Sequence, residues 1–186
     1  YDKFTCNQYL KAFGVRIAES LLLRRGQSVS DEEVVEKIGL PCFIKPSLGG
    51  SSFGVTKVKT KEQIQPAIVK AFGEAEEVIV EAFMDGTELT CGCYKTKEKS
   101  VIFPPTEVVT HNEFFDYDAK YNNSDSRTVI PAEVEEEKTE EMRRIARKIF
   151  RAVDGSGLAR VDFFIDKKTG RVLFNELNTM PGFTPI

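Results

Sequence analysis

The chain has 186 residues, 41% of them hydrophobic and 30% charged, a composition typical of a globular protein with a real core. Its formal net charge is −3, with 26 basic and 29 acidic residues interspersed, so no strong field favours nucleic acid or a membrane surface. No apolar run approaches the roughly 18 residues that span a bilayer. We therefore expect a cytoplasmic protein with small-molecule partners, and any phosphate binding must come from local groups.

The cysteines are too few for a disulfide-rich scaffold. They are Cys6, Cys42, Cys91 and Cys93, and the last two lie in a segment typical of a strand. Buried free thiols are the favoured interpretation, because the single histidine, His111, has no obvious companion ligand. A metal site at Cys91 and Cys93 is the alternative.

A capping box opens the first clear helix. Ser30 with Glu33 caps a helix over 31–38, and Gly39 is placed to end it before Pro41 makes the chain extended. The other elements expected in this half are a buried strand over 42–45, a Gly/Ser turn, a strand over 53–59, a helix from a Thr60 and Gln63 cap to about Phe72, and a strand over 77–83.

The second half combines strands with one long helix. The expected elements are strands over 87–94 and 101–109, a helix over 140–153, and strands over 158–165 and 171–178. The helix has one apolar face, made by Met142, Ile145, Ala146, Ile149, Phe150 and Val153. Strands and helices do not alternate strictly, so we predict an α+β fold of two lobes, 1–84 and 85–186, that meet near residues 84–86.

The last two strands gather charged side chains. Pairing Ile165 with Arg171 across the intervening loop sets the expected register. This register gives the cross-strand pairs Asp162 with Phe174 and Arg160 with Glu176. One side of the hairpin then carries Arg160, Asp162, Glu176 and Asn178, and the other carries Val161, Phe163, Ile165, Leu173 and Leu177.

The polar side of this hairpin is suited to a metal–nucleotide site. Carboxylate and amide oxygens are ligands for Mg²⁺ bound to phosphates, and arginine stabilises a phosphoryl group in transfer. A solvated strand end with one surface ion pair is the alternative. Phe163, Phe164 and Phe174 favour a buried hairpin, where charges without a ligand would be costly.

A glycine-rich segment follows a lysine at the end of a strand. Lys45 precedes Pro-Ser-Leu-Gly-Gly-Ser-Ser-Phe-Gly over 46–54, where glycines let backbone N–H groups approach phosphate and serines add donors. The Walker pattern is absent. A hairpin turn without a ligand is the alternative, and the carboxylate hairpin favours phosphate binding.

Several segments resemble the D-alanine:D-alanine ligase branch of the ATP-grasp superfamily, in that family's order. They are Tyr1-Asp2-Lys3, 43–46 with 49–54, 81–88, Phe115-Asp116-Tyr117-Asp118-Ala119-Lys120-Tyr121, Gly157-Leu158-Ala159-Arg160-Val161-Asp162, and Asn175-Glu176-Leu177-Asn178-Thr179-Met180-Pro181-Gly182. The resemblance implies an ATP-grasp fold, two α+β lobes with the nucleotide between them.

The resemblance also implies ATP and Mg²⁺ as cofactors, with two metal ions and Mn²⁺ as a possible substitute. The metal ligands would be Asp162, Glu176 and Asn178. ATP would be bound by Lys3, Lys45, Gly50, Ser51, Ser52, Glu81, Ala82, Phe83, Met84, Glu88 and Lys120. In this set Lys3 and Lys45 contact phosphates, residues 81–84 form the hinge that contacts adenine, and Glu88 binds the ribose.

The implied reaction phosphorylates one D-alanine, and the amine of a second then attacks the acylphosphate. The product, D-alanyl-D-alanine, serves peptidoglycan precursor synthesis. Arg160 and the Gly182 N–H would stabilise the oxyanion. Lys120 and Tyr121 lie in a loop that excludes water, with Ser51 bonded to Tyr121. The full-length protein would be a homodimer.

Two other functions remain open. One is another ATP-grasp carboxylate–amine ligase, including the D-alanine:D-lactate branch, against which Tyr121 argues because phenylalanine commonly stands there in that branch. The other is a non-catalytic ATP-binding fragment. The family's N-terminal domain and a serine beyond Ile186 are absent from these residues, so we expect the chain alone to bind ATP without ligating D-alanine.

Overall fold

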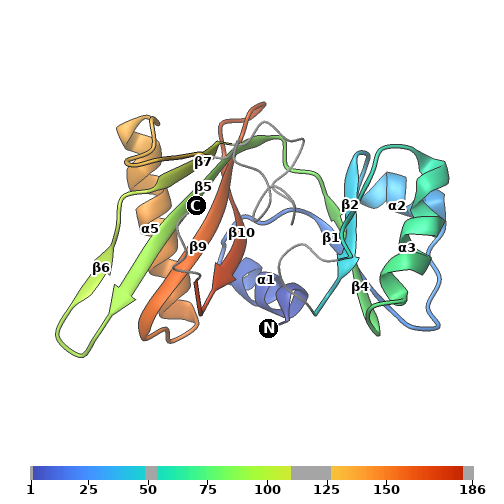
Figure 1. The fold of residues 1–186 in the computed structure, drawn as a ribbon, viewed down its shortest axis with the longest axis horizontal. Coiled ribbons are helices and arrows are strands. Elements are labelled where there is room, and N and C mark those ends of the chain that lie inside the picture. Colours follow the sequence, from blue (N-terminus) through green and yellow to red (C-terminus); the bar gives the residue numbers. More distant parts are fainter. Residues whose placement is uncertain (1, 49–53, 110–126, 182–186) are drawn as a thin grey trace. The chain divides into compact units, whose positions relative to one another are not determined.

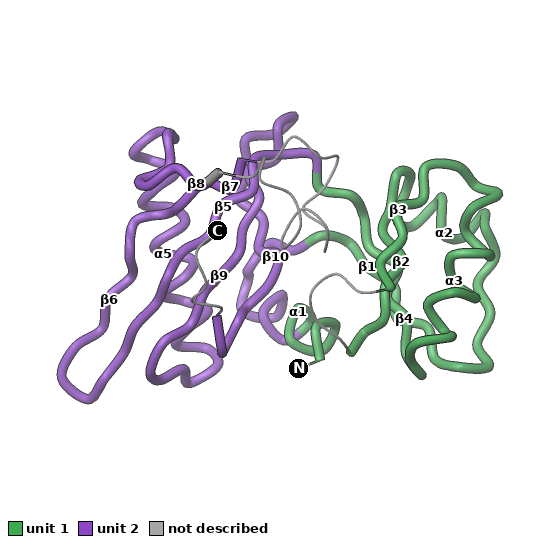
Figure 2. Tube along the Cα trace, viewed as in Figure 1, with its two compact units in different colours: residues 1–8, 18–84 green, residues 9–17, 85–186 purple. Residues whose placement is uncertain are grey.

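The computed structural model describes residues 2–48, 54–109 and 127–181. The chain divides into two compact units, which Figure 2 colours separately: unit 1 comprises residues 1–8 and 18–84, and unit 2 comprises residues 9–17 and 85–186. The first helix, α1 (Lys3–Ala12), is divided between the units after Gln8. Each unit has its own antiparallel sheet.

Unit 1 is built on a four-stranded sheet in the order β1-β4-β2-β3 (Figure 1). The strands are β1 (Ser20–Arg24), β2 (Cys42–Pro46), β3 (Thr56–Val58) and β4 (Glu77–Ala82). Helices α2 (Asp31–Lys37) and α3 (Ile64–Phe72) cover one face of it. The core between them consists of Leu23, Val29, Val34, Cys42, Ile44, Val58, Ile64, Ala67, Ile68, Ala71, Val78 and Val80. Strand β1 was missed from the sequence, and β3 is shorter than expected.

The helix ends of unit 1 confirm the capping predictions. The Ser30 Oγ accepts a hydrogen bond from the Glu33 N–H at 3.1 Å, and Gly39 follows α2 with a φ of +83°, a conformation that glycine adopts without strain. The Thr60 capping box is also present, but it opens a short 3₁₀ helix, η1 (Lys61–Gln63), that leads into α3. These ends form because each cap uses groups within a few residues of one another.

Unit 2 contains a six-stranded sheet in the order β10-β9-β5-β7-β8, with β6 paired to β5 (Figure 1). The strands are β5 (Gly86–Lys95), β6 (Ser100–Ile102), β7 (Thr106–Val109), β8 (Arg127–Val129), β9 (Gly157–Asp166) and β10 (Val172–Asn178). Helix α5 (Glu136–Ala152) packs on one face. In the described ranges, no helix is long and apolar enough to cross a membrane.

Two expected elements of unit 2 have different bounds in the structure. The single strand expected over 101–109 is interrupted, because Pro104 and Pro105 lack the N–H that a strand interior needs, and β6 and β7 form on either side. The helix expected from residue 140 begins at Glu136. Its first turn carries Glu136 and Glu137, which the positive end of the helix dipole favours.

The expected register of the last hairpin was wrong, because Ile165 pairs with Val172 instead of Arg171, and a β-bulge between Phe174 and Glu176 then shifts the register by one more residue. Phe174 pairs with Phe163 instead of Asp162, and Glu176 pairs with Asp162 instead of Arg160. Both phenylalanines are buried in the core, whereas Leu173, expected in the core, pairs with Phe164. Asn175 is the extra residue, and it returns the following polar side chains to the face opposite the core.

Candidate functional site

The sheet of unit 1 has a second face, opposite α2 and α3, that carries charge. Alternation along the strands places Phe43 and Lys45 of β2 on this face, with Lys57, Ile79 and Glu81 on the neighbouring strands. The cross-strand pairs are Phe43 with Glu81 and Lys45 with Ile79. A helix-covered core on one face therefore positions a lysine and a glutamate diagonally on the other.

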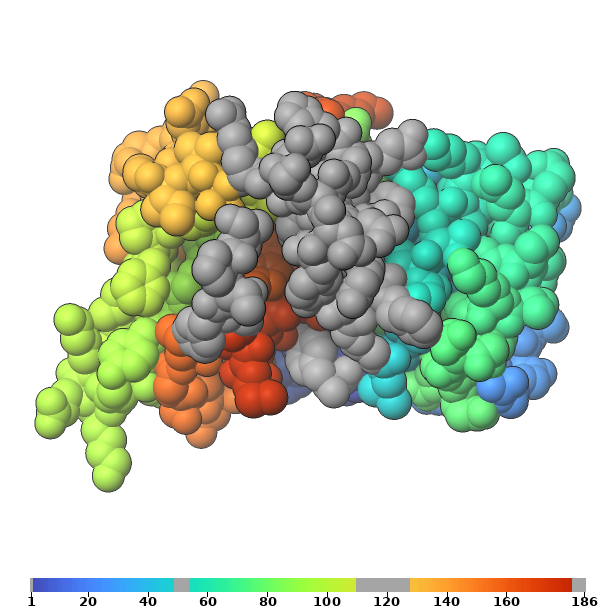
Figure 3. All heavy atoms as spheres, viewed as in Figure 1, coloured from blue at the N-terminus to red at the C-terminus, as the bar shows by residue number. Residues whose placement is uncertain are grey.

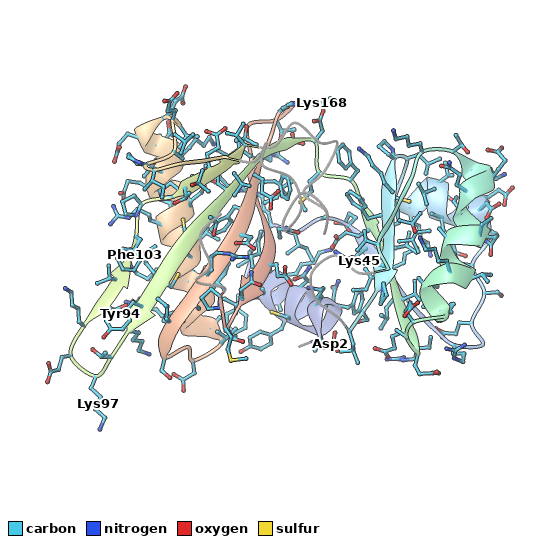
Figure 4. All side chains as sticks on the ribbon, viewed as in Figure 1. Asp2, Lys45, Tyr94, Lys97, Phe103 and Lys168 are labelled. Atoms are coloured by element: carbon cyan, nitrogen blue, oxygen red, sulfur yellow. The ribbon has the colours of Figure 1, made fainter. Side chains whose placement is uncertain are left out.

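Lys45 and Glu81 form the main ion pair of this face. The Lys45 Nζ lies 2.5 Å from the Glu81 Oε2, and the side chains are 17% and 6% exposed. Figure 4 labels Lys45 on β2. Removing both charges from water costs several kcal/mol per ion, so the pair is poor evidence for stability. Its position is better explained by a ligand with phosphate or hydroxyl groups.

An aromatic group continues this face. The Phe83 and Phe43 rings lie edge to face with centroids 5.8 Å apart, and the Lys57 Nζ lies 4.0 Å from the Phe83 centroid. The N–H groups of Ala82 and Phe83 donate to the carbonyls of Glu19 and Pro41. The backbone of Ala82 or Phe83 could therefore bind a base only by accepting a hydrogen bond at its carbonyl oxygen.

Asp2 connects the start of α1 to the end of β2. Its carboxylate accepts hydrogen bonds from the Thr5 N–H at 3.0 Å and the Thr5 hydroxyl at 2.6 Å, and from the buried Ser47 hydroxyl at 3.5 Å. Asp2 also forms a backbone bridge with Leu48. Lys3 is thereby placed beside the start of the glycine-rich segment. Sequence reasoning missed Asp2 and Ser47, although the Asp2 to Thr5 spacing is typical of a helix N-cap.

The sheet of unit 2 also has a polar face, opposite α5. Thr90 of β5 and Glu176 of β10 both pair with Asp162 of β9, and Asn178 pairs with Arg160. Glu88 lies on the same face of β5, two residues before Thr90. The carboxylates, the amide and the arginine expected from the sequence therefore occupy one sheet face.

Asp162 is the centre of this cluster and is 7% exposed. Arg160 donates Nε to the Asp162 Oδ1 at 2.8 Å and Nη2 to the Oδ2 at 3.0 Å, and the Asn178 Nδ2 donates to the Oδ2 at 2.8 Å. The hydrogen bond to Asp162 raises the pKa of Arg160 above its ordinary value, against the opposing effect of burial, and the charges of Glu176 and Glu88 add to the rise. The guanidinium is thus surrounded by negative charge.

The arrangement fits a bound Mg²⁺–nucleotide in its donor chemistry. The Thr90 Oγ1 is buried and has no hydrogen-bond partner among the residues that the structure describes, and such an atom costs about 1–3 kcal/mol unless a ligand or water pairs with it. The Asn178 nitrogen donates to Asp162, so its amide oxygen is directed away from that carboxylate. Within the described ranges no three His, Cys, Asp or Glu side chains gather as metal ligands. Two carboxylates and an amide suit Mg²⁺ because it takes further ligands from phosphates and water.

Six of the expected site residues lie outside the described residues. They are Gly50, Ser51, Ser52, Lys120, Tyr121 and Gly182.

The cysteines, all within the described residues, form no disulfide. Cys42, Cys91 and Cys93 are buried thiols, and Cys6 is half-buried. Burial raises the pKa of Cys42 to about 11 and that of Cys91 to about 12, so these thiols stay protonated and behave as apolar core residues.

Comparison with known proteins identifies close relatives. The chain matches a family model described as D-ala D-ala ligase C-terminus over residues 9–186. A D-alanine--D-alanine ligase of Bacteroides thetaiotaomicron is 70% identical over 184 residues, and one of Bacteroides fragilis is 68% identical over 184 residues. Each alignment covers 99% of this chain and 56% of the relative. The chain thus spans about half the length of the curated relatives it matches.

Solved structures give the same result at the level of the fold. D-alanyl-alanine synthetase A from Vibrio cholerae matches with a TM-score of 0.87 and 34% identity, over 100% of this chain and 57% of that one. The VanG D-Ala:D-Ser ligase from Enterococcus faecalis matches with a TM-score of 0.83 and 34% identity, over 98% of this chain and 53% of that one. These matches confirm the α+β ATP-grasp fold expected from the sequence.

Proposed function

Because the chain belongs to the D-ala D-ala ligase C-terminus family, we propose that the complete protein joins two D-alanines at the expense of ATP. The contacts of Arg160 and Asn178 with the buried Asp162 carboxylate support this most directly. Burying the Asp162 charge is costly, and a bound ligand would offset part of that cost. The described residues would bind the nucleotide, the metal and the reacting carboxyl group.

Unit 1 would bind ATP. The Lys45 ammonium group would exchange Glu81 for a phosphate oxygen, a stronger charge-assisted contact. Phe83, with Ala82 and Met84, would border the adenine, since an aromatic ring offers a flat apolar surface to a base. The Asp2 contacts support a role for Lys3 beside the glycine-rich segment that contains Gly50, Ser51 and Ser52.

Unit 2 would bind the metal. Asp162, Glu176 and Asn178 would hold two Mg²⁺ ions, for which Mn²⁺ is the alternative, and Glu88 would bind the ribose. Bound Mg²⁺ would neutralise the charge that develops on the transferred phosphoryl group. The unpaired Thr90 hydroxyl supports this role, because a metal-bound water or a phosphate oxygen would give it a partner.

Arg160 would act at the reacting carbonyl once its pair with Asp162 opens. In the first step a D-alanine carboxylate oxygen attacks the γ-phosphorus, and the bond to ADP breaks. In the second step the amine nitrogen of the other D-alanine attacks the acyl carbon, phosphate leaves and the amine loses a proton. Arg160 and the Gly182 N–H would stabilise the oxyanion that exists after the amine attacks and before the phosphate leaves. If the Asp162 oxygens bound a metal ion, they would no longer hold Arg160, which could then contact the oxyanion.

The loop residues would protect the intermediate. Lys120, Tyr121 and Ser51 would exclude water from the acylphosphate, which hydrolysis would otherwise destroy. The complete protein would work in the cytoplasm as a homodimer and supply peptidoglycan precursors. Sedimentation of the complete protein at several concentrations tests the dimer.

A ligase with another second substrate is the alternative function. The VanG protein named as a D-Ala:D-Ser ligase matches this chain at 34% identity, as does the Vibrio cholerae protein. Product analysis with D-alanine, D-serine and D-lactate in competition distinguishes these functions. Dominant D-alanyl-D-alanine formation supports the proposal, and a dominant ester or serine product contradicts it.

Nucleotide binding by the described residues is tested by calorimetry with ATP, with and without Mg²⁺. We expect Glu176→Gln to weaken metal-dependent binding at least tenfold and to leave metal-free binding nearly unchanged. Glu98→Gln, in the exposed turn between β5 and β6, is the matched control and should change neither. Equal losses with and without Mg²⁺ would remove Glu176 from the metal site, and absence of any ATP binding in a folded sample would overturn the proposal.

A further inference from the structure

A second candidate site lies on unit 2 where the end of α1 meets α5. It is a hollow of about 490 Å³ lined by Phe13, Arg144, Arg147, Lys148, Arg151 and Ala152. Helix α5 covers the sheet face opposite Arg160 and Asp162, so the sheet separates this hollow from the metal cluster. Its volume is within the range of roughly 300–1,000 Å³ that small-molecule sites occupy.

Four cations form a stripe along one side of the hollow. Positions 144, 147, 148 and 151 are spaced three, four and seven residues apart, which places them on one face of α5. At about 1.5 Å per residue the stripe is about 10 Å long. Within the described ranges, the hydrogen bonds and ion pairs of α5 side chains are made by other residues, and none of these four takes part in one. Four unpaired like charges on adjacent turns repel one another.

The nearby carboxylates of α5 are already used by other cations. Glu140 pairs with Arg143, and Glu141 pairs with Lys138 and Arg16. The helix dipole favours cations in the last turn of α5, which explains Arg151. It does not explain Arg144 in the middle of the helix, nor why the four converge on a hollow. An external anion is the partner that this charge pattern fits.

The other wall of the hollow is aromatic. The Phe13 and Tyr9 rings lie with centroids 4.9 Å apart, and the Tyr9 hydroxyl donates to the Ala152 carbonyl at 2.9 Å, which attaches α1 to the end of α5. Phe13 nevertheless remains 44% exposed. Gly14 adopts a φ of +73°, and a β-carbon at that position would lie 3.5 Å from the Lys148 Nζ.

We infer that this hollow is a second anion site that takes a ligand of the nucleoside polyphosphate class. The phosphates would lie along the cationic stripe, because arginine forks bind phosphate oxygens in pairs. The base would lie against the exposed Phe13 ring. Four cations over about 10 Å suit a chain of two or three phosphates better than a single inorganic anion.

The test uses ADP and inorganic tripolyphosphate as probes, with EDTA present so that the metal cluster contributes no metal-dependent binding. Calorimetry gives the affinity, and backbone amide NMR shifts give the location. We expect shifts over 144–151 and at the end of α1, and Arg147→Glu should weaken both probes at least tenfold when the affinity is taken from the titration of those shifts. Phe13→Ala should weaken ADP severalfold and leave tripolyphosphate unchanged.

The matched control is Lys97→Glu, which makes the same charge change at the tip of the β5–β6 hairpin of the same unit, where Figure 4 labels Lys97 and Figure 3 shows the projecting segment. It should change either affinity less than twofold. If Arg147→Glu and Lys97→Glu lowered the affinity for the probes equally, the effect would come from net charge alone, and the inference would be overturned. Shifts confined to 45–83 would refute the second site while leaving the proposed ATP site intact. An unchanged ADP affinity in Phe13→Ala would refute the nucleotide class.

Discussion

The two units place charges on the same kind of surface but hold them differently. In unit 1 a regular strand register carries Lys45, which contacts Glu81 through one pair of atoms. In unit 2 a bulged register carries Arg160, which contacts Asp162 through two hydrogen bonds. A lysine is a point charge on a flexible stem, whereas the arginine fork fixes orientation. Unit 1 is therefore suited to reaching a ligand, and unit 2 to holding one in a set geometry.

The largest effect is expected at the centre of the unit 2 cluster. Asp162→Ala leaves Arg160 and Asn178 without their acceptor and should lower the free energy of unfolding by about 3 kcal/mol, the lower end for a broken buried pair because the Arg160 side chain is 37% exposed. Urea denaturation measures it. Asp162→Asn keeps one acceptor oxygen and should cost clearly less. A loss below about 1 kcal/mol for the alanine variant would show that the two hydrogen bonds from Arg160 to Asp162 stabilise the fold no more than an exposed ion pair does.

The corresponding change in unit 1 should cost less. Glu81→Ala should lower the free energy of unfolding by about 2 kcal/mol, because Lys45 loses one contact and its flexible stem can turn towards water. The control is Glu77→Ala, which breaks an exposed pair with Arg24 and should cost under about 1 kcal/mol. High salt should reduce the loss of stability caused by Glu77→Ala but not that caused by Glu81→Ala, because salt screens exposed ion pairs more than buried ones. A Glu81 variant as costly as the Asp162 variant would contradict the comparison.

A smaller, pH-dependent effect is expected where Asp2 holds α1 to β2. Burial acts to raise the pKa of Asp2, but the hydrogen bonds from Thr5 and Ser47 outweigh it and leave the pKa below its ordinary value of 3.8. Its stabilisation is therefore complete above pH 3.8 and is lost as the pH falls through the folded-state pKa. Asp2→Ala should cost about 1 kcal/mol at neutral pH, and this cost should shrink in acid.

Thermal unfolding from pH 7 to pH 2.5 measures that profile. Asp2→Asn retains an N-cap acceptor and should keep most of the stability with little dependence on acid. A cost for Asp2→Ala that stays constant below pH 3.8 would mean that the carboxylate charge has no part in the contact.

The smallest expected effect on stability distinguishes a ligand-facing hydroxyl from a core-facing one. Thr90 of unit 2 and Thr56 of unit 1 each have a buried hydroxyl without a partner, but Thr56 pairs with Ile44 on the helix-covered face. Replacing either by valine should raise the free energy of unfolding by up to about 1 kcal/mol. Thr90→Val alone should weaken Mg²⁺–ATP binding severalfold in calorimetry. Equal ATP affinity in both variants would remove Thr90 from the site.

The sequence determined the features that depend on neighbouring residues. The caps at Ser30 and Thr60, and the helix end at Gly39, follow from groups a few residues apart. The period-two pattern of β9 and β10 placed Asp162 and Asn178 on one face. The order of the motifs, through its resemblance to the D-alanine:D-alanine ligase branch, predicted the ATP-grasp fold.

Only the tertiary structure decided what depends on packing between distant segments. Burying Phe174 beside Phe163 while Glu176 pairs with Asp162 on the opposite face required a bulge at Asn175, which no local pattern indicates. The pairing of Lys45 with Glu81, 36 residues later, depends on β2 lying beside β4. The unpaired hydroxyl of Thr90 depends likewise on its position opposite Asp162. Sequence periodicity fixes which residues share a face of a strand, whereas core packing fixes the register and so which side chains meet.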